Sequence, residues 1–307
     1  NEVYMKIPFI KESTQEFIKE ARKTPNYSLL DFLHGYIYGR WIYHYIDIGT
    51  GNHPAVKKYL EMKKRFGITP KDEPATDKKG MAETYHGKAI PLETAKQMVQ
   101  INEEINIPDL EQVIPYKRAR SIVMKNPEHI LAIDCPCRVA KEDHCTPVDV
   151  CLVIGDPFAS FIREHHPDRS REITRDEAIE ILKAEDERGH VHHAFFKDAM
   201  LERFYAICNC CECCCGAINS HKSGNPMLAS SGFIAQVDED LCISCDNCVE
   251  YCQFGALEME DFVMGVNYEN CMGCGVCVDK CEQDSITLVA DAKKGIPLDI
   301  CALMDQV

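Results

Sequence analysis

The sequence predicts an α+β protein with a mostly helical N-terminal region, a small cysteine-rich α/β domain and a C-terminal domain built on repeated cysteines. Helical spacing of apolar residues dominates the first 125 positions, whereas short apolar runs alternate with helical patterns after residue 128. All 19 cysteines follow residue 134. We place the parts at residues 1–115, 116–217 and 232–292, with a tail at 293–307.

The N-terminal region opens with two predicted helices. Residues 9–23 carry apolar side chains at helical spacing, and the pattern ends before Pro25. Residues 29–48 are rich in aromatic side chains, which could form a docking face or a cofactor-binding face. Such a stripe is more often a helix buried against its neighbours. We therefore predict that this helix, including Trp41, belongs to the core.

The rest of the chain before the C-terminal domain alternates between element types. A loop is predicted at residues 69–87, and helical spacing returns at 91–105 and 116–125. Short apolar runs then predict buried strands at 129–134, 148–154 and 204–207, and helical patterns predict helices at 159–164 and 175–187. Thr174 and Glu177 form a capping box for the last helix. Residues 219–232, rich in Ser, Gly and Asn, predict a linker.

The strongest motif is an internal repeat near the C-terminus. Two runs of the form C-x-x-C-x-x-C-x-x-x-C lie 29 residues apart, at Cys242, Cys245, Cys248 and Cys252 and at Cys271, Cys274, Cys277 and Cys281. A single C-x-x-C is compatible with a zinc knuckle or a redox pair, but two such runs in register are typical of cubane iron–sulfur clusters. Strand-like stretches at 233–237, 256–259 and 286–289 flank them. The runs therefore predict an electron carrier.

With these runs, residues 232–292 resemble the bacterial-type ferredoxins that hold two 4Fe–4S clusters. The resemblance implies a bacterial ferredoxin-like fold and crossed ligation, in which the fourth cysteine of each run binds the other cluster. The implied sets are Cys242, Cys245, Cys248 and Cys281 for one cluster, and Cys271, Cys274, Cys277 and Cys252 for the other. Gln253 and Glu282 stand where the family usually has proline, which affects the turns rather than the ligands.

Ten further cysteines follow the predicted strands of the α/β domain. We predict one further iron–sulfur site at Cys135, Cys137, Cys145 and Cys151, and a second at Cys208, Cys210, Cys211 and Cys213, which could share ligands. Arg138 could hydrogen bond to cluster sulfur. The alternative for the first set is zinc that holds the loops together.

The remaining candidate ligands of the chain are predicted to have no metal role. Cys214 and Cys215 are expected to be spare thiols, since adjacent side chains seldom reach one small cluster together, and Cys301 to be a free buried thiol. Several histidines on predicted polar loops are expected to be solvated rather than to bind metal: His165, His166, His190, His192 and His193.

The motifs Cys-Pro-Cys-Arg at 135–138 and Cys-Asn-Cys-Cys-Glu-Cys-Cys-Cys at 208–215, followed by the ferredoxin-like tail, carry a second resemblance. Residues 115–290 resemble uncharacterised 4Fe–4S dicluster proteins of anaerobes. That resemblance implies a related fold but no substrate.

Charge and cysteine usage limit the classes of function. The net charge of −15 argues against nucleic-acid binding and is compatible with steering toward a basic patch on a redox partner protein. No run of 18 apolar residues and no signal-peptide core is present, so we expect a cytoplasmic protein without a membrane span. Six cysteines between positions 208 and 215 are too crowded for ordinary disulfides, which favours metal-bound thiolates in a reducing, anaerobic setting.

Three functions remain open on these observations. The first is a ferredoxin-like electron-transfer protein that relays electrons among its clusters and a redox partner, as an oligomer or a subunit of a larger oxidoreductase complex. The second is an iron–sulfur oxidoreductase with a reactive, incompletely ligated cluster or a dithiol in the middle domain. The third is a metal-stapled assembly subunit. No nucleotide-binding or serine-hydrolase motif is present.

Overall fold

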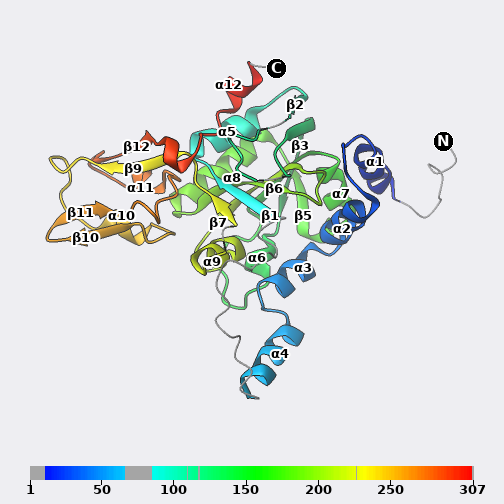
Figure 1. Ribbon diagram of the computed structural model, residues 1–307, viewed down its shortest axis with the longest axis horizontal. Coiled ribbons are helices and arrows are strands. Elements are labelled where there is room, and N and C mark those ends of the chain that lie inside the picture. The colour runs from blue at the N-terminus through cyan, green and yellow to red at the C-terminus, as the bar shows by residue number, and fades with distance from the viewer. Residues whose placement is uncertain (1–10, 66–84, 109, 117, 226, 306–307) are drawn as a thin grey trace.

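The fold is organised around an eight-stranded sheet, shown in Figure 1. The computed structural model describes residues 11–65, 85–108, 110–116, 118–225 and 227–305. The strand order is β2-β3-β4-β7-β6-β1-β8, with β5 also paired to β3, and every pair is antiparallel except β1 with β8. The strands are β1 (Tyr85–Ala89), β2 (Ile105–Ile107), β3 (Ile122–Ile133), β4 (Cys151–Asp156), β5 (Ser170–Ile173), β6 (Val191–Lys197), β7 (Arg203–Cys210) and β8 (Leu228–Ala229).

Helices cover both faces of this sheet, so its central strands are buried on both sides. Every residue of β6 is buried, as expected for a strand with helices on either face. The helices are α1 (Glu12–Ala21), α2 (Leu29–Arg40), α3 (Ile42–Gly49), α4 (Pro54–Arg65), α5 (Leu92–Gln100), α6 (Pro136–Val139), α7 (Phe158–His165), α8 (Arg175–Glu187), α9 (Gly216–Lys222) and α12 (Ile300–Met304). In Figure 1, α4 points away from the sheet.

Two hydrophobic cores follow from the alternation of side chains along the strands. Leu131 and Val153 face the first core, which contains residues of α1, α2, α3 and α7. Ile130 and Leu152 face the second core, which contains residues of α5 and α8. The first core also includes several of the middle cysteines, so the cysteine-rich region lies on the face covered by the N-terminal helices.

The C-terminal domain is a smaller unit beside the sheet (Figure 1). Strands β9 (Phe233–Val237) and β12 (Ile286–Ala290) pair antiparallel, as do β10 (Leu257–Glu260) and β11 (Val263–Val266). Two single-turn helices, α10 (Asn247–Glu250) and α11 (Val276–Asp279), each contain a cysteine of one run. The strands predicted before, between and after the two runs are therefore present.

Several predicted elements are confirmed, while others differ. Helix α8 begins with the predicted capping box, in which Thr174 Oγ1 accepts a hydrogen bond from the Glu177 N–H. The prediction of a helix at 116–125 is wrong, because residues from Ile122 onward form β3 and pair with β2 and β4. Mixed helices and strands confirm the α+β class.

The predicted boundaries around the sheet also differ from the observed ones. The helix predicted at 91–105 ends at Gln100, and β1 and β2 lie within the region expected to be helical. The sheet thus draws strands from outside residues 116–217. The predicted linker at 219–232 contains the end of α9 and all of β8. Residues 69–84 of the loop predicted at 69–87 lie outside the described residues, and residues 85–87 belong to β1 instead.

The aromatic segment is only partly buried. It forms two helices, since the backbone of Trp41 leaves helical geometry, and Trp41 itself is 46% exposed. The prediction that Trp41 belongs to the core is therefore wrong. Tyr38, three residues earlier on α2, is 1% exposed. Gly35 lets α2 pack closely against the turn between β6 and β7, because a Cβ there would lie 2.1 Å from the Ala199 carbonyl oxygen.

Candidate metal centres

Each implied ligand set of the C-terminal domain lines its own small cavity. One cavity is lined by Cys242, Cys245, Cys248 and Cys281. The other is lined by Cys252, Cys271, Cys274 and Cys277. In both cavities the fourth cysteine of one run lies with the first three cysteines of the other run. The fold thus brings together the crossed sets that the ferredoxin resemblance implies.

Local backbone geometry directs these cysteines inward. Gly273 and Gly275 adopt positive φ values of 61° and 92°, a left-handed conformation that glycine adopts without steric cost. A Cβ at position 273 would lie 2.2 Å from the carbonyl oxygen of Phe233. Backbone N–H groups point at sulfur as well: Ala256 N lies 3.1 Å from Cys252 Sγ, and Ser285 N lies 3.3 Å from Cys281 Sγ. Such donors stabilise a thiolate ligand and its cluster.

The two cavities differ in exposure. Around the first, Cys245 is exposed, and two apolar side chains nearby are largely in solvent: Ile243 is 64% exposed and Phe262 86%. The second lies against the first core of the sheet, and burial raises the pKa of Cys274 to about 12. The domain therefore has one outer and one inner candidate cluster position.

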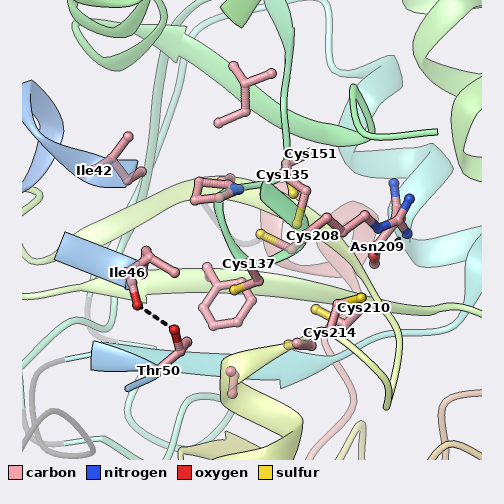
Figure 2. A pocket seen from close by; sticks show the side chains of 18 of the residues that line it. Ile42, Ile46, Thr50, Cys135, Cys137, Cys151, Cys208, Asn209, Cys210 and Cys214 are labelled. Atoms are coloured by element: carbon pink, nitrogen blue, oxygen red, sulfur yellow. Dashed lines mark hydrogen bonds between the residues drawn. The ribbon is translucent and has the colours of Figure 1, made fainter. Parts of the chain in front are cut away.

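A third cavity lies on the cysteine-bearing face of the sheet (Figure 2). Its volume is about 90 Å³. Cys151 begins β4, Cys208 lies near the end of β7, and these antiparallel neighbours place the two cysteines together. Besides Cys211 and Cys214, six cysteines line it: Cys135, Cys137, Cys151, Cys208, Cys210 and Cys215. Residues of α2 and α3, including Tyr38, Ile42 and Ile46, line the same cavity. We call this space the cysteine cavity.

The thiols around the cysteine cavity form a connected chain. Cys135 interacts with Cys137 and Cys151, Cys137 also interacts with Cys215, and Cys151 with Cys208. Hydrogen bonding by Cys215 would lower the pKa of Cys210, but burial and the neighbouring cysteines, Cys208 first among them, together outweigh it and raise that pKa to about 12. A buried thiol with a raised pKa, such as that of Cys210, ionises readily when a metal replaces its proton, which favours a metal-bound state.

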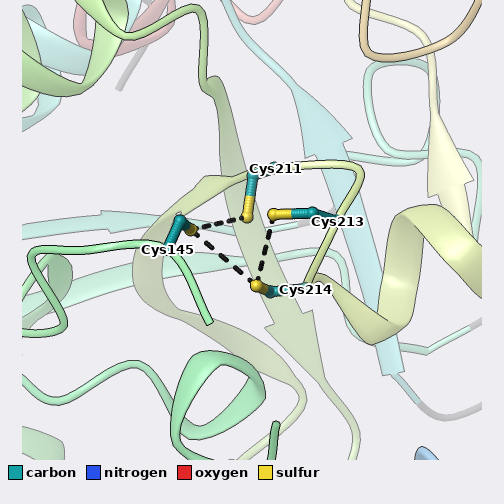
Figure 3. Close-up of side chains that lie close together, drawn as sticks. All are labelled: Cys145, Cys211, Cys213 and Cys214. Atoms are coloured by element: carbon teal, nitrogen blue, oxygen red, sulfur yellow. Dashed lines mark hydrogen bonds between the residues drawn. The ribbon is translucent and has the colours of Figure 1, made fainter. Parts of the chain in front are cut away.

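A group of four thiols adjoins this cavity, and two of them, Cys211 and Cys214, also line it (Figure 3). Cys145 Sγ lies 3.3 Å from Cys211 Sγ and 3.8 Å from Cys214 Sγ, and Cys213 Sγ lies 3.3 Å from Cys214 Sγ. All four sulfur atoms lie within 4.8 Å of one another. We call this set the four-thiol group.

This arrangement divides the ten middle cysteines differently from the two predicted sets. Cys145 joins the four-thiol group and does not line the cysteine cavity. Cys214 and Cys215, predicted to be spare, both line the cysteine cavity, and Cys214 also belongs to the four-thiol group. The reason is tertiary: the loop after α6 carries Cys145 away from Cys135 and toward the turn that follows β7.

Residues 241–286 match the family model of a 4Fe-4S dicluster domain. No curated protein matches the chain. The match contains all eight cysteines that line the two cavities of the C-terminal domain, whereas no named family accounts for the cysteine cavity. None of the helices in the described part of the chain combines the length and apolar character that a bilayer crossing requires.

The dicluster domain contacts the middle cysteines directly. Gln253, which replaces the usual proline, accepts a hydrogen bond through Oε1 from the Glu212 N–H at 2.7 Å. Glu212 lies between Cys211 and Cys213, and Gln253 follows Cys252. A single side chain therefore joins a ligand loop of the inner dicluster position to the four-thiol group.

A second contact runs through aromatic rings. Phe254 lines the inner dicluster cavity, and its ring centroid lies 6.3 Å from that of His193 on β6. His193 pairs with Cys208 across β6 and β7. Burial lowers the pKa of His193 to about 3, so the ring is neutral. These residues place the inner dicluster cavity beside the cysteine cavity.

The remaining predicted residues are placed as follows. The guanidinium of Arg138 bonds to Glu185 and to carbonyl oxygens rather than to sulfur, although its backbone N–H bonds to the Cys135 thiolate. The prediction that the five histidines are solvated is wrong for four, which lie buried on α7, β6 or just before β6: His165, His190, His192 and His193. Cys301 is exposed rather than buried, because it is Ile300 of α12 that faces the core.

Proposed function

We propose that this protein transfers electrons between the two clusters of its dicluster domain and a further iron–sulfur cluster in the cysteine cavity. The dicluster domain supports an iron–sulfur electron-transfer role. The observation that carries the third cluster is the gathering of six buried or half-buried thiols around one cavity, directly beside the inner dicluster position.

The proposed ligands follow the three cavities. The outer cluster takes Cys242, Cys245, Cys248 and Cys281, and the inner cluster takes Cys271, Cys274, Cys277 and Cys252. The third cluster takes its ligands from Cys135, Cys137, Cys151, Cys208, Cys210 and Cys215. Thiolates supply the ligands that all of these clusters require.

The difference in exposure suggests a direction for electron flow. The outer cluster would exchange electrons with a redox partner, because exposed apolar side chains such as Ile243 and Phe262 surround it. The inner cluster would pass electrons to the cysteine cavity through the contacts of Gln253 and Phe254. The acidic charge of the chain would steer a basic partner surface. We further propose that the chain works as a subunit of a larger oxidoreductase complex in an anaerobic cytoplasm.

One observation favours a second candidate, an iron–sulfur oxidoreductase. Six thiols exceed the four that a single cube uses, so the cavity can supply free thiols or a cluster with an open position. Apolar side chains of α3, Ile42 and Ile46, line the cavity and could contact a small apolar substrate.

The test is an iron and sulfide count on anaerobically prepared protein, with electron paramagnetic resonance of the reduced state. Two dicluster clusters account for about eight irons, and the third raises the total to about twelve. Cys151→Ser and Cys208→Ser should each reduce the count toward eight and leave the dicluster resonances. A count of eight in the unaltered protein, with all dicluster signals present, would contradict the proposal.

A further inference from the structure

The four-thiol group is too tight for an iron–sulfur cube. Its closest sulfur pairs are 3.3, 3.3 and 3.8 Å apart, and all four atoms lie within 4.8 Å of one another. A tetrahedron with metal–sulfur distances of about 2.3 Å has sulfur–sulfur edges of about 3.8 Å. The observed spacing therefore fits one ion at the centre of four sulfur atoms.

The dicluster domain provides an internal comparison. Within the described residues, neither of its cysteine sets brings three sulfur atoms within 4.8 Å of one another. Ligands of a cube stand farther apart because four irons and four sulfides lie between them. The same chain thus shows two kinds of cysteine spacing, and in the part that the structure describes the four-thiol group alone has the spacing of a mononuclear site.

The local sequence agrees with a single ion. Cys213 and Cys214 are adjacent, and the backbone turns tightly here, since the N–H groups of Cys214 and Cys215 both bond to the Cys211 carbonyl oxygen. Adjacent cysteines can both reach one central ion, whereas two corners of a cube are separated by a larger gap. The fourth thiol, Cys145, comes from a separate loop and completes the set (Figure 3).

Charge also favours a cation at this position once the thiols ionise. Four thiolates at these distances would repel one another strongly, and a soft divalent ion that replaces their protons offsets much of the repulsion. Lys141 lies beside the group and donates a hydrogen bond to the Cys213 carbonyl oxygen. A lysine near a complex of four thiolates and one divalent ion would offset part of its remaining negative charge.

We propose that Cys145, Cys211, Cys213 and Cys214 bind one tetrahedral divalent ion, zinc or iron, separate from any iron–sulfur cluster. The ion would fix the loop that carries Cys145 to the turn after β7. That turn also holds Glu212, whose N–H binds Gln253 of the dicluster domain. Zinc would make the site purely structural, whereas iron would add a one-electron centre.

The proposal does not depend on the third cluster, and its test separates the two. Zinc, iron and sulfide are measured in full-length protein prepared anaerobically, and X-ray absorption is recorded at the zinc edge. We expect about one zinc per chain, with four sulfur neighbours at about 2.3 Å and no iron neighbour. If iron occupies the site, iron exceeds sulfide by about one atom per chain, since cubes contain the two in equal number.

Variants then assign the site. Cys145→Ser and Cys213→Ser should each lose that one ion while keeping the dicluster resonances. Cys301→Ser, an exposed cysteine on α12, is the matched control and should keep it. Loss of iron and sulfide together in the ratio of a cube would overturn the proposal. So would unaltered protein with neither zinc nor excess iron, a result that does not depend on whether the variants fold.

Discussion

Arg138 and Glu185 form a fully buried ion pair, with Nη2 of the guanidinium 2.5 Å from Oε2 of the carboxylate. Each side chain is 1% exposed. The guanidinium also donates hydrogen bonds to the carbonyl oxygens of Pro147 and Asn209. Arg138 therefore connects the loop that leads to Cys151 and the end of β7, which carries Cys208 and Cys210, to helix α8.

The first prediction concerns this pair. Glu185→Ala should lower the free energy of unfolding by about 3–5 kcal/mol, because Arg138 would keep a buried charge without its partner. Glu180→Ala on the same helix is the control: Glu180 pairs with Lys183 at the surface, and its loss should change stability little. Denaturant unfolding of both variants checks this, and equal stabilities would contradict it.

The second prediction concerns crossed ligation. Cys252→Ala should damage the inner cluster, whose other ligands are Cys271, Cys274 and Cys277, and leave the outer cluster's resonances unchanged. Cys281→Ala should do the reverse. Electron paramagnetic resonance of the two reduced variants compares them. If Cys252→Ala removed the outer cluster instead, each run would bind its own cube.

The third prediction separates buried from exposed aromatic residues in the N-terminal helices. Tyr38→Ala should cost about 3–5 kcal/mol of stability, since the ring is buried and its hydroxyl lies 2.9 Å from that of Tyr205. Trp41→Ala should cost much less, because the indole is partly in solvent. Urea midpoints of the two variants measure both losses of stability. A larger loss for Trp41→Ala than for Tyr38→Ala would contradict the prediction and show that the indole is buried in solution.

The fourth prediction concerns the bond between Gln253 and Glu212. Gln253→Ala should lower stability by about 0.5–1.5 kcal/mol and slow electron exchange between the dicluster domain and the cysteine cavity. Iron content should not change, because Gln253 is not a ligand. Gln236→Ala, on the exposed side of β9, is the control. Stopped-flow reduction measures the exchange, and equal rates in both variants would remove Gln253 from the path.

The fifth prediction concerns pH. The hydrogen bond from His129 to Asp156, 3.0 Å between Nδ1 and Oδ1, raises the pKa of His129 above its ordinary 6.5. A raised folded-state pKa gives stability that is complete below pH 6.5 and is lost as pH rises through the folded value. The stability difference between the protein and His129→Gln should therefore shrink from pH 6 toward pH 8. A difference that grows with pH would contradict the sign.

The sequence repeat indicates the first three cysteines of each dicluster cavity, because they are local to one run, whereas the fourth, from the other run, was implied by the ferredoxin resemblance. The grouping of the middle cysteines was not predictable, since the position of Cys145 depends on a loop that crosses to the turn after β7. The helix predicted at 116–125 failed for a related reason. Its apolar spacing fits either element, and pairing with distant strands decided the outcome.

Burial of the histidines was missed although the sequence carried a signal for it. His192 and His193 stand between Val191 and the apolar run Ala194-Phe195-Phe196, which is typical of a buried strand, and β6 lies in the middle of the sheet with helices on both faces. The mistaken position of Trp41 has a different cause. Aromatic residues occur on all sides of the helix predicted at 29–48, so periodicity does not indicate which side faces the core. The break after Arg40 turns Trp41 outward.

The walls of the cysteine cavity come from parts of the chain that are made far apart in time. Ile42 and Ile46 are synthesised early and Met227 late, and all three line the same space. Contacts across such long sequence separations form slowly, whereas each dicluster cavity draws on a short stretch of chain. During biogenesis the dicluster domain can therefore take up its clusters as an independent unit. The cysteine cavity, in contrast, must receive its metal before α2 and α3 settle over it, or wait for them to open.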